Sequence, residues 1–301
     1  MKPRDETRSI GWIDLALLAI VFIWGANYAI VKWALSEFKP LAFTFLRFAV
    51  AAVLTPALAW SAEKSLSIQR RDRPWVILLG LTAHVLYQFL FIQGLARTRA
   101  SNASLILATV PIWVALIGTL RGSERIRGRN WLGIVLAFVG IFLLVSAGGA
   151  GIRLSASTLT GDLLVLGATI VWAVYTIGAR GVLQRNSPLR VTAWMLITSL
   201  PWMLLIALPE LRSQDWRAVS TQGWLGFGYS AVLAITLGYI VWNTGVQRLG
   251  SARTSLYNYL PPLVSVVVAW AFLGESMQPL QALGAVGILL GVVLGRDRPK
   301  G

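Results

Sequence analysis

Residues 14–28 read DLALLAIVFIWGANY, and residues 162–176 read DLLVLGATIVWAVYT. Each stretch opens with an aspartate and reaches a tryptophan ten residues later, and Pro40 recurs as Pro188 at the same offset of 148. Seven more residues recur at an offset of 151: Gly94, Arg97, Ser104, Pro111, Glu124, Gly133 and Gly140 match Gly245, Arg248, Ser255, Pro262, Glu275, Gly284 and Gly291. The offsets differ by one three-residue insertion, so the chain is a duplicated half. We expect two repeats, spanning 1–152 and 153–301.

The composition predicts a membrane protein. Hydrophobic residues make up 56% and charged residues 13% of the 301 residues, too little charge to cover a soluble domain of this length. A helix needs roughly 20 apolar residues to cross the hydrocarbon core, and lipid cannot satisfy the polar groups of an open backbone. We therefore expect an all-α integral membrane protein with ten transmembrane helices, at 11–35, 40–60, 74–95, 100–120, 129–146, 160–183, 188–208, 222–247, 252–273 and 279–295.

The formal charge of +15 does not predict nucleic acid as a partner, because its placement follows the membrane. With the N-terminus in the cytoplasm, nineteen basic residues fall on the inner side and six on the outer side of the ten predicted helices. The positive-inside rule then places both termini in the cytoplasm, as in a multi-pass protein of the inner membrane. Five helices per repeat also make the second repeat enter the bilayer inverted. The expected partners are the lipid bilayer and a small-molecule substrate, and we expect a monomer.

The residues that are missing exclude several kinds of chemistry. The chain has no cysteine and one histidine, so neither a disulfide nor a cluster of metal ligands is expected. There is no G-x-x-x-x-G-K-[ST] motif, so ATP does not drive the protein directly, and we expect no cofactor. No acidic residue lies at mid-depth in a predicted helix, which favours transport down the substrate's own gradient over proton exchange.

Several motifs resemble one family. Trp24-Gly25-Ala26-Asn27-Tyr28, Leu46-Arg47-Phe48 and the spacing of Pro111 to Glu124 and of Pro262 to Glu275 are similar to the drug/metabolite transporter superfamily. Within it the chain resembles the ten-helix EamA permeases, and among these the bacterial aromatic amino-acid exporters. The resemblance implies two inverted five-helix repeats around a central cavity, with helices 1, 3, 4, 6, 8 and 9 around the cavity and helices 2, 5, 7 and 10 further out. The second half departs from the pattern, with Tyr175 in place of Asn27 and Met195 in place of Arg47.

Aromatic and amide side chains in the middle of the helices are the candidates for substrate binding. Helical spacing places His84, Tyr87 and Gln88 on one face of the third helix. Such groups could stack a planar apolar solute and hydrogen-bond its polar end, whereas interhelical packing and hydrogen bonding are the alternative. The full set is Trp24, Asn27, Tyr28, His84, Tyr87, Gln88, Trp113, Trp172, Tyr175, Tyr239, Trp242, Asn243, Tyr257 and Asn258.

Three further features have two interpretations each. Arg47 lies about two turns inside the second helix and could hold a substrate carboxylate, but the peripheral place of that helix in the family favours a structural anchor. Pro111, Pro261 and Pro262 predict kinks that are either gates or static packing. Glycines 284, 287, 291 and 295, echoed by Gly133, Ala137 and Gly140, predict close packing against a helix of the same chain or a second protomer.

The leading hypothesis is a secondary transporter that exports amino acids, aromatic or apolar ones, from the cytoplasm by alternating access. The alternative within transport is a broad drug or metabolite exporter. An intramembrane enzyme would need a nucleophile with a base or a metal cluster, and a single histidine without a nearby carboxylate supplies neither.

Overall fold

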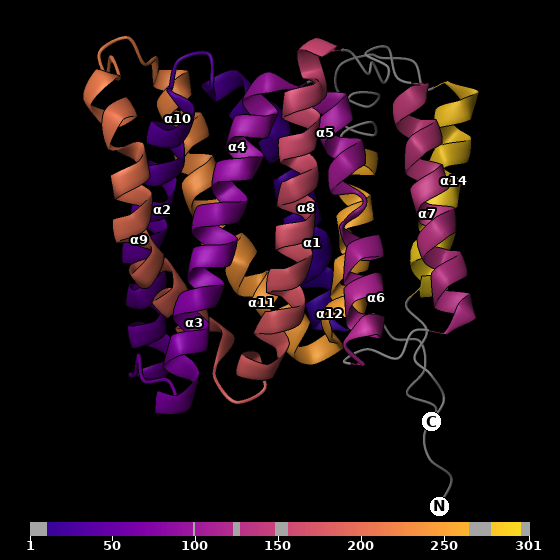
Figure 1. Ribbon diagram of the computed structural model, residues 1–301, viewed down its shortest axis with the longest axis horizontal. Coiled ribbons are helices and arrows are strands. Elements are labelled where there is room, and N and C mark those ends of the chain that lie inside the picture. The colour runs from indigo at the N-terminus through magenta and orange to yellow at the C-terminus, as the bar shows by residue number, and fades with distance from the viewer. Residues whose placement is uncertain (1–10, 99, 123–126, 148–155, 265–277, 296–301) are drawn as a thin grey trace, which may run out of the picture.

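The computed structural model describes residues 11–98, 100–122, 127–147, 156–264 and 278–295. Helices run up and down between two ends of a bundle (Figure 1), and we call the end where α1 begins the lower end. The helices are α1 (Trp12–Ala34), α2 (Pro40–Glu63), η1 (Arg70–Asp72), α3 (Arg73–Gly80), η2 (Leu81–Leu86), α4 (Tyr87–Arg97), α5 (Ala100–Leu107), α6 (Val110–Leu120), α7 (Gly128–Ser146), α8 (Ala156–Leu183), α9 (Pro188–Ser213), α10 (Thr221–Tyr229), η3 (Ser230–Leu237), α11 (Gly238–Leu249), α12 (Ser251–Ser255), η4 (Leu256–Tyr259) and α14 (Pro279–Gly295).

The predicted all-helical membrane fold is confirmed. Eight helices of the described residues are long and apolar enough to cross a membrane, and α14 is a shorter apolar helix. The predicted ninth helix is helical over 251–264, while the rest of that segment lies outside the described residues. Large apolar side chains such as Leu205, Leu225 and Val53 are exposed on the outer surface, where lipid would cover them.

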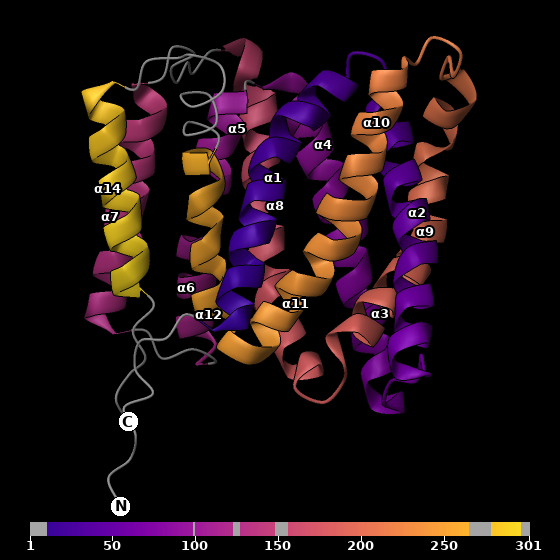
Figure 2. The same ribbon diagram turned by 180° about the vertical axis from the view of Figure 1, so that it is seen from behind.

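The two repeats run in opposite directions. In Figures 1 and 2, α1 rises from the lower end and α8, its counterpart in the second repeat, descends toward it. Equivalent prolines, Pro40 and Pro188, occupy the first turn of α2 and α9, where the missing N–H costs no helical hydrogen bond. Local sequence signals thus start equivalent helices at opposite ends of the bundle.

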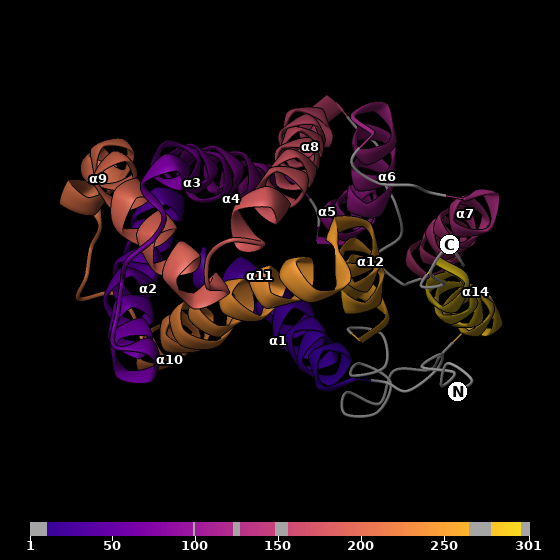
Figure 3. The same cartoon turned by 90° about the horizontal axis from the view of Figure 1, so that it is seen from below.

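Glycines bring α7 and α14 into close contact. A Cβ on Gly133 would lie 2.6 Å from the carbonyl oxygen of Gly291, and one on Gly140 would lie 2.6 Å from that of Gly284. Only glycine permits backbones to approach this closely. The small-residue ridge therefore packs within the chain, and the α7–α14 pair stands at one side of the bundle, as the view from below shows (Figure 3).

The predicted interruptions of the fourth and ninth helices are also present. The fourth is broken between Leu107 and Val110, just before Pro111. The ninth tightens into the 3₁₀ turn η4 just before Pro261 and Pro262. The interpretation of these breaks as gates stays a prediction.

Candidate functional site

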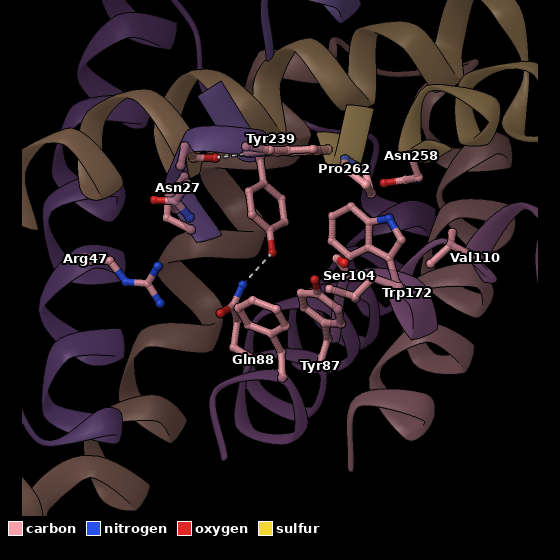
Figure 4. A pocket seen from close by; sticks show the side chains of 15 residues that line it. Asn27, Arg47, Tyr87, Gln88, Ser104, Val110, Trp172, Tyr239, Asn258 and Pro262 are labelled. Carbon is pink, nitrogen blue, oxygen red and sulfur yellow. Dashed lines mark hydrogen bonds between the residues drawn. The ribbon is translucent and has the colours of Figure 1, made fainter. Parts of the chain in front are cut away.

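A cavity lies among α1, α2, α4, α5, α6, α8, η3, α11 and η4 (Figure 4). Its volume is about 60 Å³, which suits a few water molecules. An amino acid would need the surrounding helices to move apart. The lining residues are Trp24, Asn27, Arg47, Tyr87, Gln88, Phe91, Ser104, Leu107, Val110, Trp172, Ala234, Ile235, Tyr239, Asn258 and Pro262.

Aromatic rings form one part of the cavity wall. Trp172 lies at the centre of this group, with ring centroids 4.8 Å from Tyr87, 5.5 Å from Tyr239 and 6.2 Å from Trp24. Tyr87 is also stacked on Phe91 at 5.7 Å. Each such pair contributes roughly 0.5–1.5 kcal/mol beyond area burial, so the wall is held in shape by its own contacts.

Two π-helical turns position these aromatic side chains. η2 and η3 occupy equivalent places in the two repeats, and wide turns of this kind leave backbone carbonyls available. Trp24 Nε1 donates to the carbonyl of Ala234 in η3 at 2.9 Å, and the Tyr239 hydroxyl donates to the equivalent carbonyl of Ala83 in η2 at 3.4 Å. Each repeat thus anchors an aromatic residue of the other.

Contacts between equivalent residues place the cavity at the pseudo-two-fold axis. Trp24 and Trp172 are equivalent and meet edge to face. Gln88 and Tyr239 are also equivalent, and Gln88 Nε2 donates to the Tyr239 hydroxyl at 3.2 Å. Residues related by a two-fold axis touch each other only close to that axis.

The polar part of the wall carries buried atoms without partners. Asn27 Oδ1 and Gln88 Oε1 are acceptors, and Arg47 Nε and Asn258 Nδ2 are donors, that have no hydrogen-bond partner among the described residues. Buried polar groups are almost always paired, and an unpaired one costs about 1–3 kcal/mol. Four such atoms around one cavity are therefore available to bound water or to a polar ligand.

Seven of the predicted site residues lie in the cavity wall. They are Trp24, Asn27, Tyr87, Gln88, Trp172, Tyr239 and Asn258. Their contact with substrate stays a prediction.

His84 does not line this cavity, contrary to the expectation from its helical face. Its ring packs against Tyr239 at 4.8 Å and Phe48 at 5.1 Å, and Nδ1 lies 3.1 Å from Ser199 Oγ. The interhelical hydrogen bond, one of the two interpretations, is therefore present. The side chain borders a smaller depression among α2, η2, α4 and α9 instead.

Tyr175, Asn243 and Trp242 form a layer behind the wall. The Tyr175 hydroxyl donates to Asn243 Oδ1 at 2.6 Å, and Asn243 Nδ2 donates to Thr192 Oγ1 at 2.9 Å. Trp242 is fully buried and packs at 5.5 Å on both Trp24 and Trp172. The structure brings these three to the site but not into the cavity, because the wall residues cover them.

Two candidates lie elsewhere, and a third is not described. The Tyr257 hydroxyl donates to Asp14 Oδ1 at 2.5 Å, and Trp113 Nε1 donates to Thr109 Oγ1 at 3.1 Å. Tyr28 lies on α1, and its side chain is outside the described part of the structure.

Arg47 lines the cavity although α2 was expected to lie further out. α2 packs against η3, and the side chain reaches past that contact with its guanidinium toward the cavity (Figure 4). The sequence signal for this residue was a single ionisable group in mid-helix.

Comparison with known proteins agrees with this architecture. The sequence model described as the EamA-like transporter family matches twice, at residues 11–146 and 159–295. A protein described as a probable amino-acid metabolite efflux pump, from Salmonella typhimurium, is 29% identical over 93% of both chains. A probable terminal-alkyne amino-acid exporter from Streptantibioticus cattleyicolor is 28% identical, covering 95% of this chain and 94% of the relative.

Two further matches add to these. An uncharacterized transporter of Bacillus subtilis, YyaM, is 26% identical over 93% of this chain and 92% of its own. A solved structure titled "Crystal structure of protein" shares the fold with a TM-score of 0.80 at 17% identity, covering 95% of this chain and 96% of its own.

The fold and the cavity define a helical membrane transporter built from two repeats of opposite direction. The chain belongs to the EamA-like transporter family.

Proposed function

We propose that this protein exports amino acids, aromatic or apolar ones, from the cytoplasm by alternating access. The observation that carries the proposal is the cavity on the pseudo-two-fold axis, where stacked aromatic rings face unpaired buried polar atoms. A ring wall suits an apolar side chain, and the unpaired donors and acceptors suit a charged amino-acid backbone. The names of two relatives, an amino-acid metabolite efflux pump and an amino-acid exporter, support the same substrate class.

The proposal includes the setting of the protein in the membrane. The two repeats are 1–152 and 153–301, the protein is a monomer of the inner membrane, and the lower end of the bundle faces the cytoplasm. Basic residues of the described loops support this orientation, because Lys64, Arg71, Arg121 and Arg185 lie at the lower end.

A broad exporter of lipophilic cations fits the cavity less well. Its one charged lining residue is Arg47, which would repel a cation in a medium of low dielectric constant. No group of three or more potential metal ligands occurs in the described residues.

Counterflow in proteoliposomes tests the proposal. Vesicles loaded with unlabelled phenylalanine, tryptophan or leucine should take up the labelled amino acid transiently, whereas vesicles loaded with a lipophilic cation should not. An imposed pH difference should leave the final amino-acid distribution unchanged, because no described acidic residue lines the cavity. Uptake driven only by lipophilic cations would reject the amino-acid assignment.

A further inference from the structure

Arg47 is a buried charge at the centre of the molecule. Its side chain is 1% exposed, and it lies on α2 about two turns from the first residue of that helix, Pro40. An ionised group at such a depth is costly in a membrane and marks a functional site by default.

The contacts of Arg47 leave its charge without a counter-ion. One terminal nitrogen donates to Ser230 Oγ at 2.9 Å and the other to Thr44 Oγ1 at 3.3 Å. The guanidinium also lies over the Phe43 ring at 4.5 Å. No acidic side chain of the described residues forms an ion pair with it, and Nε has no partner there.

These contacts hold the guanidinium in place rather than neutralise it. Hydroxyl groups and a ring fix the orientation of the side chain, which a purely structural arginine would also require. A structural role alone does not explain the unpaired Nε or the missing negative charge, since buried charges are normally paired.

The neighbouring unpaired atoms have the opposite preference. Asn27 and Gln88 line the same cavity. Their side-chain oxygens, Oδ1 and Oε1, are hydrogen-bond acceptors, and no donor of the described residues is bonded to either oxygen. Figure 4 shows Arg47 and Asn27 on one side of the cavity, with Trp172 and Tyr87 on the other. The wall thus offers a cation for a carboxylate, acceptors for an ammonium group, and rings for an apolar body.

We propose that Arg47 binds the substrate's carboxylate through its guanidinium, whose terminal nitrogens point toward the cavity (Figure 4), and that Asn27 and Gln88 accept hydrogen bonds from the substrate's ammonium group. This inference rests on the proposed function and narrows it: the carboxylate is required, and amines that lack it are rejected. An arginine presents a planar fork to a carboxylate, which a lysine cannot reproduce.

A ligand series on the unaltered protein tests the inference without any substitution. L-Phenylalanine, 3-phenylpropionate, phenethylamine and L-phenylalaninamide share one ring and differ in their charged groups. We expect thermal stabilisation of the purified protein and inhibition of phenylalanine counterflow to be strongest with phenylalanine and weaker with 3-phenylpropionate. Phenethylamine and the amide should be at least tenfold weaker than phenylalanine.

Variants of Arg47 provide the second measurement. Arg47→Gln should lower phenylalanine binding at least tenfold and remove the preference for phenylalanine over phenethylamine. The affinity of Arg47→Lys for phenylalanine should lie between those of the unaltered protein and of Arg47→Gln. Arg121→Gln, an exposed arginine just beyond α6, is the matched control and should behave as the unaltered protein. Gel filtration and thermal denaturation show which variants are folded. If Arg47→Gln does not fold, the ligand series on the unaltered protein alone tests the role of Arg47.

The possible results separate this inference from the function on which it rests. Exchange of 3-phenylpropionate without any amino acid would reject amino-acid export and keep the role of Arg47. Equal potency of phenethylamine and phenylalanine would overturn the role of Arg47 while amino-acid transport stands. The role of Arg47 would also be overturned if neither phenylalanine nor 3-phenylpropionate stabilised the protein.

Discussion

At the scale of single residues, the position of Trp24 depends on a glycine of the other repeat. Trp24 donates to the Ala234 carbonyl, and a Cβ on Gly238 would lie 2.7 Å from the same indole nitrogen. The indole therefore occupies the space that a side chain at position 238 would need.

Gly238→Ala should displace the Trp24 indole from the cavity wall. We expect amino-acid counterflow to fall severalfold, because overpacking of about 1–3 kcal/mol must be relieved by moving the ring or the helix. Gly228→Ala, where nothing lies within 4 Å of the added methyl group, is the control. Unchanged transport and unchanged tryptophan fluorescence in Gly238→Ala would contradict this reading.

The sequence identified seven of the fifteen wall residues but could not separate the wall from the layer behind it. Gln88 and His84 lie one turn apart on one helical face, yet only Gln88 borders the cavity. Helical phase selects a face but does not say which neighbour covers it, and here Tyr239 covers His84. Arg47 is the converse case, because a helix that lies further out can still extend a long side chain to the cavity wall.

At the scale of helices, the sequence predicts the long spans but not the π-turns within them. The apolar runs predicted the long spans closely, for example 11–35 against Trp12–Ala34. The π-turns η2 and η3 were not predicted, because residues 81–86 and 230–237 contain no proline or glycine to signal them. Carbonyl groups in these turns accept hydrogen bonds from side chains of the opposite repeat. Contacts between the repeats, rather than the local sequence, therefore accompany the π-turns.

Gly140→Ala should separate α7 from α14. The added methyl group would meet backbone atoms of α14 at 2.6 and 2.7 Å, which side-chain motion cannot relieve. We expect a lower midpoint of thermal denaturation, corresponding to roughly 1–3 kcal/mol of overpacking. Gly128→Ala, at an open position in α7, should leave the midpoint unchanged or raise it, since alanine favours helix. Equal midpoints for the two variants would refute the expectation.

At the scale of the whole molecule, equivalent side-chain pairs link helices at the two ends of the bundle. At the upper end, Asp162 Oδ1 accepts from Thr98 Oγ1 at 2.5 Å and from Asn102 Nδ2 at 3.2 Å. At the lower end, Asp14 lies 3.7 Å from the Arg253 guanidinium, and Asn102 and Arg253 are equivalent positions. Each pair joins the first helix of one repeat to the fourth helix of the other.

Removing either aspartate should open the end at which it lies. The chain has no cysteine, so Ser104→Cys in the cavity wall gives a single thiol. With Asp162→Ala, labelling of that thiol by a membrane-impermeant maleimide should accelerate from the side of the upper end, and with Asp14→Ala from the opposite side. Asp215→Ala, an exposed aspartate between α9 and α10, is the control. Acceleration from the same side in both variants would show that the pairs are not opposed gates.

The contact between α7 and α14 bears on the evolutionary origin of the chain. Gly133 is equivalent to Gly284 and Gly140 to Gly291, yet Gly133 meets Gly291 and Gly140 meets Gly284. A single five-helix ancestor, inserted in the membrane in both orientations, could form the same interface as a homodimer. Two glycines of each copy would suffice, because two-fold symmetry makes the first glycine of one copy meet the second glycine of the other. Fusion into one chain frees the copies to diverge: Met195 stands at the position equivalent to Arg47, so the charge in the cavity wall comes from the first repeat and not from the second.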